Sequence, residues 1–249
     1  MSNSKNAKKR IDLLLVQRGL ADSRQRAQAM IIAGEVRVDD RPVKKASETV
    51  AEDARIEIFG RGSKYASRGG FKLEGALGDS GMSVEGLTCA DIGSSNGGFT
   101  DCLMQRGAKR VYAVDVNTKQ LDWKLRQDPR VTAIEKNARF LKPDDLGEAV
   151  EFVVVDVSFI SVAKLMDAVV SFAGPGAVFL ILVKPQFELE KKLVGKGGIV
   201  RDAALHKQAI VSVSGAAERA GLKVLGVFPS RVTGAEGNQE YFLHAKRPD

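Results

Sequence analysis

The sequence predicts an α/β protein, in which a mostly parallel sheet is covered on both faces by helices and is preceded by a small α+β domain. Two observations lead to this prediction. From Ser67 onward, short apolar runs typical of buried strands alternate with stretches of helical periodicity. The first of these runs leads through a glycine-rich turn into a helix, the order found in doubly wound nucleotide-binding sheets. Helices between successive strands imply a parallel sheet that is buried on both faces.

The elements expected in the large domain follow from these runs. Strands are predicted at 87–91, 110–115, 131–134, 151–156, 177–183, 223–228 and 240–245. Helices are predicted at 71–77, 97–106, 159–171 and 203–220. The longest apolar stretch, 168–183, is interrupted by Gly174-Pro175-Gly176. We interpret it as a helix end, a turn and a buried strand rather than as a membrane span.

The small domain is predicted to contain two short helices followed by small strands. The helices are expected at Lys9–Arg18 and Arg24–Ala33, with Ser23 as the N-cap of the second and Gly34 after its end. Strands are expected at 36–38 and 56–58, with a turn at 39–40. The stretch 60–64 has the composition of a linker. The boundary is therefore predicted near residue 62, which gives domains at 9–62 and 63–249.

The charge of the chain is unevenly distributed. Of the formal net charge of +7, all lies in residues 1–72, which hold 16 Lys and Arg against 9 Asp and Glu. Residues 73–249 hold 22 of each kind. A basic domain joined to a neutral one suggests a module that binds a polyanion. The alternative is a solvated basic surface that only keeps the protein soluble.

Other features of the sequence narrow the class of protein. The two cysteines, Cys89 and Cys102, lie in apolar surroundings without metal-ligand spacing, as expected for reduced core residues. The polar, basic N-terminus has no apolar segment typical of a signal peptide. We therefore expect a cytoplasmic protein with no membrane partner and no metal. The sequence makes no prediction of the oligomeric state.

The glycine-rich turn, Asp91 to Thr100, predicts a cofactor site. Gly93, Gly97 and Gly98 allow the backbone to approach a ligand closely. Their spacing is not the G-x-G-x-x-G of pyrophosphate binding, which favours a ligand without phosphates, such as S-adenosyl-L-methionine. Asp115 ends the next strand, where the ribose diol of a nucleotide is usually held. The alternative is an ordinary turn between a strand and a helix.

Four ionisable residues suggest a catalytic site. Asp156 and Lys184 end strands, Lys72 begins the first helix of the large domain, and Glu240 opens the last strand. Ligands of such sheets bind at the carboxyl ends of the parallel strands. A lysine that follows six apolar residues is partly desolvated, and a second lysine nearby would lower its pKa further. The alternative for each residue alone is a solvated strand end or a salt bridge.

Several motifs resemble known families. Residues 9–58 resemble the S4 RNA-binding domain, through Arg10-Ile11-Asp12, 19–24 (Gly-Leu-Ala-Asp-Ser-Arg) and 34–38 (Gly-Glu-Val-Arg-Val). Residues 67–249 resemble the FtsJ-type ribose methyltransferases. The combination resembles the TlyA family, also labelled hemolysin A, through 67–70 (Ser-Arg-Gly-Gly), 156–161 (Asp-Val-Ser-Phe-Ile-Ser) and 184–188 (Lys-Pro-Gln-Phe-Glu). One departure is Asp39-Asp40, where family hairpins often have Asn-Gly; it bears on the geometry of that turn and not on the function.

The resemblance implies a Rossmann-like methyltransferase that methylates the 2′-hydroxyl of cytidines in ribosomal RNA, free or in ribosomal subunits. It implies a catalytic tetrad of Lys72, Asp156, Lys184 and Glu240; Glu240 is preferred over the nearby Glu236. Lys184 would be the base or the oxyanion partner. The expected residues for S-adenosylmethionine are Asp91, Gly93, Ser94, Gly97, Gly98, Phe99, Asp115 and Asn137. The expected RNA contacts are Arg10, Arg24, Gln25, Arg26, Arg37, Lys44, Lys45 and Arg68.

Two other functions compete with this interpretation. The first is a membrane-active hemolysin, which the family label suggests, but the sequence has no long amphipathic segment with a wide apolar face. The second is an RNA-binding protein with an inactive methyltransferase domain. The complete loop and the complete set of four ionisable residues favour an active enzyme over both.

Overall fold

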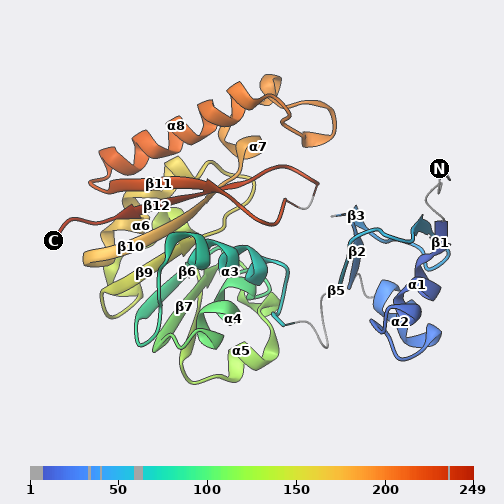
Figure 1. Cartoon of the computed structure of the whole chain (residues 1–249). Helices are drawn as coiled ribbons and strands as arrows, with labels where there is room; N and C mark the ends of the chain where they lie inside the picture. Colours follow the sequence, from blue (N-terminus) through green and yellow to red (C-terminus); the bar gives the residue numbers. More distant parts are fainter. Residues whose placement is uncertain (1–7, 33–34, 40, 59–63, 235) are drawn as a thin grey trace. The chain divides into compact units, whose positions relative to one another are not determined.

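The computed structural model of the 249-residue chain describes residues 8–32, 35–39, 41–58, 64–234 and 236–249. The chain forms two compact units (Figure 1). The smaller contains the described residues up to Lys64, and the larger contains Tyr65–Gly234 and Asn238–Asp249. The boundary predicted near residue 62 lies outside the described residues, as do Gly34 and Asp40.

The small unit packs two helices against short strands. Its elements are β1 (Lys8–Arg10), α1 (Ile11–Gln17), α2 (Arg24–Ile32), β2 (Val36–Val38), β3 (Arg41–Pro42), β4 (Thr49–Ala51) and β5 (Ile56–Ile58). Strands β3, β2 and β5 form one sheet, and β1 pairs with β4. The core consists mainly of Ile11, Leu14, Leu15, Ala27, Met30, Ile31, Val36 and Val38. The α+β character predicted for this domain is confirmed.

The first helix begins two residues later than predicted. Lys9 and Arg10 pair with Val50 and Thr49 as part of β1 and are therefore not helical. The predicted N-cap of α2 is present, because the Ser23 hydroxyl accepts a hydrogen bond of 3.1 Å from the backbone amide of Arg26.

The large unit is built on a seven-stranded sheet. Its strands are β6 (Thr88–Ile92), β7 (Arg110–Asp115), β8 (Val131–Glu135), β9 (Val150–Val155), β10 (Ala173–Val183), β11 (Lys223–Pro229) and β12 (Tyr241–Lys246). Their order is β11-β12-β10-β9-β6-β7-β8. Strands β10, β9, β6, β7 and β8 are parallel neighbours, and β12 is antiparallel to both β10 and β11. The mostly parallel sheet is confirmed.

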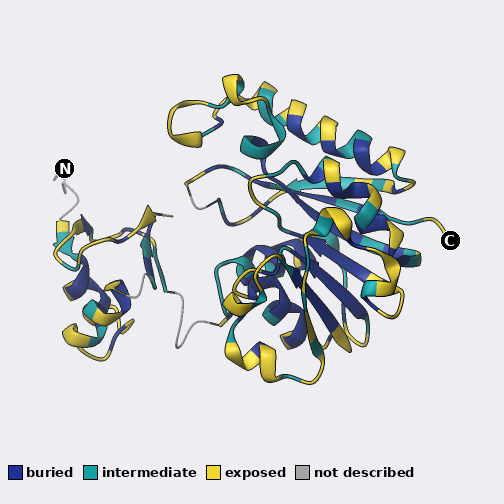
Figure 2. Cartoon of the chain, turned by 180° about the vertical axis from the view of Figure 1, so that it is seen from behind, coloured by how far each residue is buried: buried dark blue, intermediate teal, exposed yellow. Residues whose placement is uncertain are grey.

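Helices cover both faces of this sheet (Figures 1 and 2). The α-helices are α3 (Gly69–Ser80), α4 (Gly98–Gln105), α5 (Trp123–Gln127), α6 (Met166–Ser171), α7 (Pro185–Glu188) and α8 (Ala203–Arg219). Side chains alternate along each strand, so Phe152 and Val154 pack with α3 and α4, whereas Val153 and Val155 pack with α6 and α8. Short 3₁₀ helices lie at Thr118–Gln120, Ala138–Phe140, Pro143–Asp145, Val162–Leu165, Lys191–Leu193 and Lys196–Gly198.

Three local predictions for the large domain are wrong. The helix predicted at 159–171 begins only at Val162, because Phe159 has a left-handed backbone with a φ of 66°. The stretch 174–176 is not a turn between elements; it lies inside β10, where the register against β9 shifts between Ala173 and Val178. Glu240 lies one residue before β12 and does not open it.

Candidate active site

The carboxyl ends of the parallel strands meet at one edge of the sheet, and two adjoining cavities lie there. The larger, about 520 Å³, is lined by residues that follow β6, β7, β8 and β9. The smaller, about 170 Å³, is lined by the start of α3, the glycine-rich loop and Lys184. Both cavities share Gly93, Ser95, Asp156 and Ser158 in their walls. A ligand in one cavity would therefore face a ligand in the other across Asp156.

The glycines of the glycine-rich loop are required for different physical reasons. Gly93 has a φ of 89°, and a Cβ atom there would lie 2.5 Å from the carbonyl oxygen of Asp156. A Cβ at Gly98 would collide with the Ser67 hydroxyl, so this glycine allows α4 to start against α3. A Cβ at Gly97 would collide with Leu121 and Leu125. Gly93 and Gly98 line the cavities, whereas Gly97 lines neither and serves packing.

Asp115 and Asn137 both line the larger cavity, as expected for residues that hold a nucleoside. The Asp115 carboxylate accepts hydrogen bonds from the backbone amides of Ser95 (2.9 Å) and Asn117 (3.0 Å). It thereby ties the glycine-rich loop to the end of β7. The Asn137 side chain accepts a hydrogen bond from the amide of Arg139 and caps a 3₁₀ helix.

Asp91 does not lie on the surface of either cavity, although we expected it to contact the cofactor. It is fully buried, and one carboxylate oxygen accepts a 2.6 Å hydrogen bond from the Thr100 hydroxyl. The other oxygen has no partner in the described part of the chain. Burial raises the pKa of Asp91 to about 7, and the nearby charges of Asp156 and Asp115 contribute to this rise.

Two other predicted loop residues, Ser94 and Phe99, line the smaller cavity. The Ser94 hydroxyl is buried and has no hydrogen-bond partner within the described ranges. The Phe99 ring stacks on Phe242, with 6.2 Å between centroids, and so joins the cavity wall to the core.

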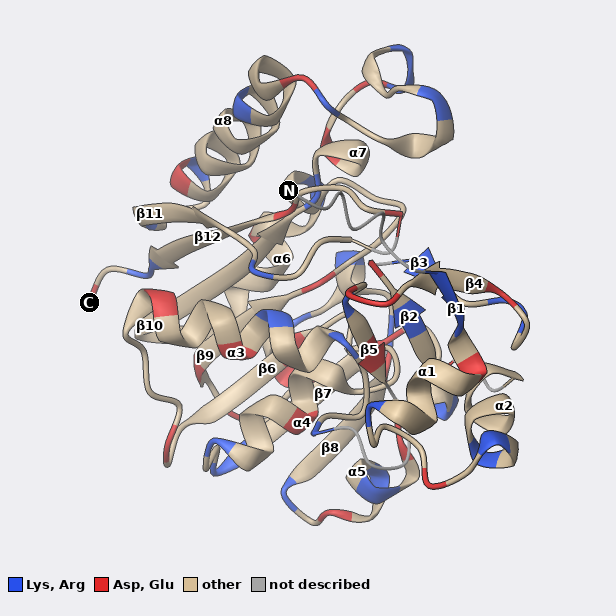
Figure 3. Cartoon of the chain, turned by 45° about the vertical axis from the view of Figure 1, so that its right-hand side comes forward, with Lys and Arg blue, Asp and Glu red and all other residues tan. Residues whose placement is uncertain are grey.

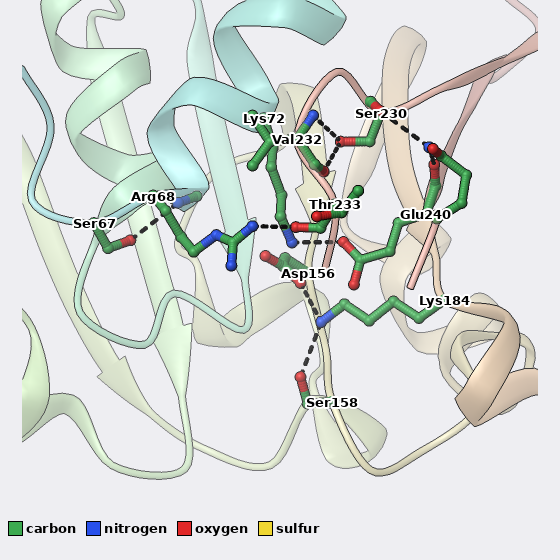
Figure 4. A network of polar contacts seen from close by, with 12 residues as sticks. Ser67, Arg68, Lys72, Asp156, Ser158, Lys184, Ser230, Val232, Thr233 and Glu240 are labelled. Carbon is green, nitrogen blue, oxygen red and sulfur yellow. Dashed lines mark hydrogen bonds and ion pairs between the residues drawn. The ribbon is translucent and has the colours of Figure 1, made fainter. Parts of the chain in front are cut away.

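The four ionisable residues come together as two ion pairs (Figure 4). The Lys184 Nζ atom lies 2.5 Å from Asp156 Oδ1 and donates a 2.9 Å hydrogen bond to the Ser158 hydroxyl. The Lys72 Nζ atom donates a 2.5 Å hydrogen bond to Glu240 Oε2. Burial raises the pKa of Asp156, but the charges of Lys184 and Lys72 outweigh burial and hold this pKa below its usual range. Asp156 is therefore an anion between two lysines.

Arg68 belongs to this group in space, although we predicted it only as an RNA contact. Its side chain lies beside Lys72 and Asp156 (Figure 4) and donates a hydrogen bond to the carbonyl oxygen of Thr233. Arg68 also lines the smaller cavity. A cation at this place can face an anionic group of whatever ligand occupies that cavity.

Three residues that position the site were not predicted from the sequence. Ser158 accepts a hydrogen bond from Lys184 and lines both cavities. Glu188 accepts hydrogen bonds from the Ser161 hydroxyl (2.6 Å) and the Val162 amide (2.8 Å), and so joins α7 to the segment after β9. Asn238 is buried two residues before Glu240. Ser158 and Glu188 lie in the motifs at 156–161 and 184–188, but no sequence motif pointed to Asn238.

Two of the predicted RNA contacts of the small unit, Arg10 and Arg24, bind a buried acid, Asp12. The Arg10 guanidinium donates two hydrogen bonds to Asp12, at 3.0 and 2.9 Å, and Arg24 donates one at 2.9 Å. The hydrogen bond from Arg10 lowers the pKa of Asp12 well below its usual range, against the opposing effect of burial. The side chains of Arg10 and Arg24 remain 38% and 52% exposed. Arg26 lies 3.8 Å from Glu35.

The remaining predicted contacts of this unit differ in their exposure. Gln25, Lys44 and Lys45 are exposed, and Arg37 is partly buried in β2.

No helix within the described ranges is long and apolar enough to cross a membrane. The described residues contain no group of three or more His, Cys, Asp or Glu side chains that could hold a metal ion.

Two known protein families match this chain, one in each of its two units. The FtsJ-like methyltransferase family matches residues 65–247, and the S4 domain matches residues 9–56. The chain is 44% identical over 236 residues to the 16S/23S rRNA (cytidine-2′-O)-methyltransferase TlyA of Mycobacterium tuberculosis, covering 94% of this chain and 88% of the relative. It is 40% identical to Hemolysin A of Brachyspira hyodysenteriae, covering 94% of this chain and 98% of that protein.

A solved structure shows the same likeness. A protein from Streptococcus thermophilus that is labelled a hemolysin is 38% identical, with a TM-score of 0.76, and the match covers 98% of this chain and 90% of that one. The family resemblance predicted from the sequence is confirmed. The chain belongs to the TlyA family of FtsJ-like methyltransferases that carry an S4 domain.

Proposed function

We propose that this protein transfers a methyl group from S-adenosylmethionine to the 2′-oxygen of cytidine in ribosomal RNA. One observation carries the proposal: Asp156 and Ser158, which hold Lys184, lie in the wall shared by both cavities. The larger cavity has a volume suited to a nucleoside cofactor. The smaller one is lined by Lys72 and Lys184, next to which an acceptor hydroxyl would lie.

The residues of the larger cavity fit S-adenosylmethionine. The backbone of Gly93 and Ser95 would lie against the ligand, Asp115 would accept hydrogen bonds from a ribose diol, and Asn137 would contact the base. When bound, this cofactor supplies a methyl group on a positively charged sulfur. The Asp156 carboxylate lines both cavities, and its charge is near enough to raise the pKa of the buried Asp91. Negative charge at this place favours a cationic ligand over a neutral one.

Lys184 is the residue that we propose to act on the acceptor oxygen. A ribose hydroxyl is a poor nucleophile, and a positioned lysine can either accept its proton or stabilise the developing negative charge. Asp156 and Ser158 fix the position of Lys184 Nζ. The Lys72–Glu240 pair would hold the acceptor ribose, and Arg68 would face an adjoining phosphate.

The substrate class rests on the relatives and on the charge of the small unit. The Mycobacterium tuberculosis relative is named for methylation of cytidine in 16S and 23S rRNA. Residues 1–64, which make up most of the small unit, hold 14 Lys and Arg against 9 Asp and Glu, as expected for a domain that binds RNA. We therefore propose ribosomal RNA, free or in subunits, as the partner, which would place the enzyme in the cytoplasm.

A labelling assay tests the proposed function. Purified protein is incubated with tritiated S-adenosylmethionine and with ribosomal subunits or deproteinised rRNA from a strain that lacks the gene. We expect tritium in the RNA fraction with the wild type and none with Lys184→Ala. Absence of label from every RNA preparation would contradict the proposal.

RNA binding by the small unit has its own test. We expect Arg24→Ala/Arg26→Ala to weaken RNA binding and to flatten its salt dependence, because fewer counterions are released. Since Arg24 also holds the buried Asp12, Lys44→Ala/Lys45→Ala serves as a second variant that breaks no ion pair with a described residue. RNA affinity is measured at several salt concentrations, and S-adenosylmethionine affinity should stay unchanged in both variants. If the salt dependence of RNA binding equals that of the wild type in both variants, this surface does not contact RNA.

The pKa of Asp91 predicts a pH dependence of cofactor binding. A bound cation favours the ionised carboxylate, so S-adenosylmethionine affinity should rise several-fold as the pH increases through about 7, the pKa of this buried group. Asp91→Asn should remove most of this rise. Calorimetric titration between pH 6 and 8 measures both, with S-adenosylhomocysteine, whose sulfur is neutral, as the control ligand. An equal pH dependence for the two ligands would exclude this electrostatic role.

A further inference from the structure

The segment between α7 and α8 concentrates positive charge within the large unit. Residues 73–249 are neutral as a whole, but residues 189–201 contain Lys191, Lys192, Lys196 and Arg201 against a single acid, Glu190. All four basic residues are exposed. We call residues 189–201 the basic loop; it projects from the large unit next to α7 (Figures 1 and 3).

The charges of the basic loop are not used inside the protein. Lys192 forms an exposed ion pair of 2.7 Å with Glu190, which contributes little binding energy. Within the described ranges, Lys191, Lys196 and Arg201 form no ion pair with any acid. By contrast, the lysines of the catalytic site, Lys72 and Lys184, each have a carboxylate partner. The loop therefore presents most of its positive charge to solvent.

Both ends of the basic loop are attached to the catalytic elements. Its N-terminal end follows α7, the helix that begins directly after Lys184. At its C-terminal end, the buried Asn238 accepts a 2.9 Å hydrogen bond from the Val200 amide and donates a 2.8 Å bond to the Gly198 carbonyl. Asn238 lies two residues before Glu240. The loop is thus anchored between the two segments that carry Lys184 and Glu240.

A second contact holds the same end of the loop. The His206 ring makes hydrogen bonds of 2.8 Å with the Val200 carbonyl and with the Tyr241 hydroxyl, and Tyr241 directly follows Glu240. A loop that is fixed at its base loses less conformational entropy when it binds a partner.

We propose that the basic loop is a second RNA-contact surface, which binds phosphates of the strand that enters or leaves the acceptor cavity. The inference rests on the proposed function, because the acceptor nucleotide must lie beside Lys184 and its flanking phosphates must pass near the segments that anchor the loop. Flexible lysines suit a phosphate backbone, whose charge is the same in every sequence. The acceptor cavity, and not the loop, would recognise the nucleotide itself.

The test compares two triple variants with equal loss of charge. Lys191→Ala/Lys192→Ala/Lys196→Ala removes the lysines of the loop. The matched control, Lys109→Ala/Arg219→Ala/Lys223→Ala, removes three exposed cations at the opposite edge of the sheet, before β7 and around the start of β11. Affinity for deproteinised 16S and 23S rRNA is measured by filter binding at several salt concentrations, alongside the KM for rRNA, kcat and the affinity for S-adenosylmethionine.

We expect the loop variant to bind rRNA about tenfold more weakly and to reduce the slope of log affinity against log salt by about 2, with the cofactor affinity and the thermal unfolding midpoint unchanged. The KM for rRNA should rise by the same factor while kcat changes little. The control variant should stay within about twofold of the wild type in rRNA affinity. RNA affinities and salt slopes that are equal in the two variants would overturn the inference. Binding is measured without turnover, so a wild type that fails to methylate contradicts the proposed function separately.

Discussion

Lys184→Ala is expected to lower the rate of methyl transfer by about 100-fold or more, while S-adenosylmethionine still binds. Lys184 Nζ is held by Asp156 and Ser158 at the point where the two cavities meet, but it does not line the larger, cofactor-sized cavity. Its loss should therefore affect the reacting oxygen rather than the binding of the methyl donor. Single-turnover kinetics and calorimetry measure the two effects separately.

Lys184→Arg is the matched variant for this prediction. Arginine keeps the positive charge beside Asp156 but cannot act as a base, because its guanidinium stays protonated. Partial activity in this variant would identify Lys184 as a stabiliser of the oxyanion, and complete loss would identify it as the base. Turnover near that of the wild type in Lys184→Ala would remove Lys184 from the mechanism.

Glu240→Ala is expected to lower the free energy of unfolding by about 3 kcal/mol or more, in addition to abolishing activity. The Lys72 and Glu240 side chains are only 8% and 3% exposed, and they bond to each other at 2.5 Å. Removal of the carboxylate leaves the buried Lys72 ammonium without its partner. Denaturant unfolding of the variant, followed by circular dichroism, measures the loss.

Two variants control this measurement. Arg231→Ala breaks an exposed ion pair with Asp79, for which we expect a loss below about 1 kcal/mol. Glu240→Gln keeps the shape and one hydrogen-bond acceptor, so its stability should lie between those of the wild type and Glu240→Ala. Equal unfolding free energies for Glu240→Ala and Arg231→Ala would show that the buried pair does not stabilise the fold.

Much of the fold could be predicted because charged residues mark the ends of apolar strands in the sequence. The apolar run of β7 is bounded by Arg110 and Asp115, and the prediction matched its ends. The left-handed backbone of Phe159 could not be predicted, because a non-glycine residue gives no local signal for such a conformation. The glycines inside β10 were misread for a related reason: Gly and Pro mark turns and bulges alike.

The location of the site could be predicted better than its contacts. Asp115 ends β7, Asp156 and Lys184 directly follow β9 and β10, and the topology alone brings such residues to one edge. The choice of partners depends on distant packing: Lys72 and Glu240, which form one pair, are 168 positions apart. Glycine spacing does not distinguish packing from ligand contact: Gly97 was predicted beside the cofactor, but it lines neither cavity and packs against Leu121 and Leu125. Asp91 is fully buried and also lines neither cavity, so any effect on a ligand would act through its charge.

The most direct test of the reaction is the identity of the methylated nucleoside. Ribosomal RNA from a strain without the gene is incubated with the protein and S-adenosylmethionine, digested to nucleosides and analysed by mass spectrometry, with Lys184→Ala in parallel. We expect 2′-O-methylcytidine to appear with the wild type and not with the variant. A methyl group on a base, as in 5-methylcytidine, or on the ribose of another nucleoside would contradict the proposed reaction.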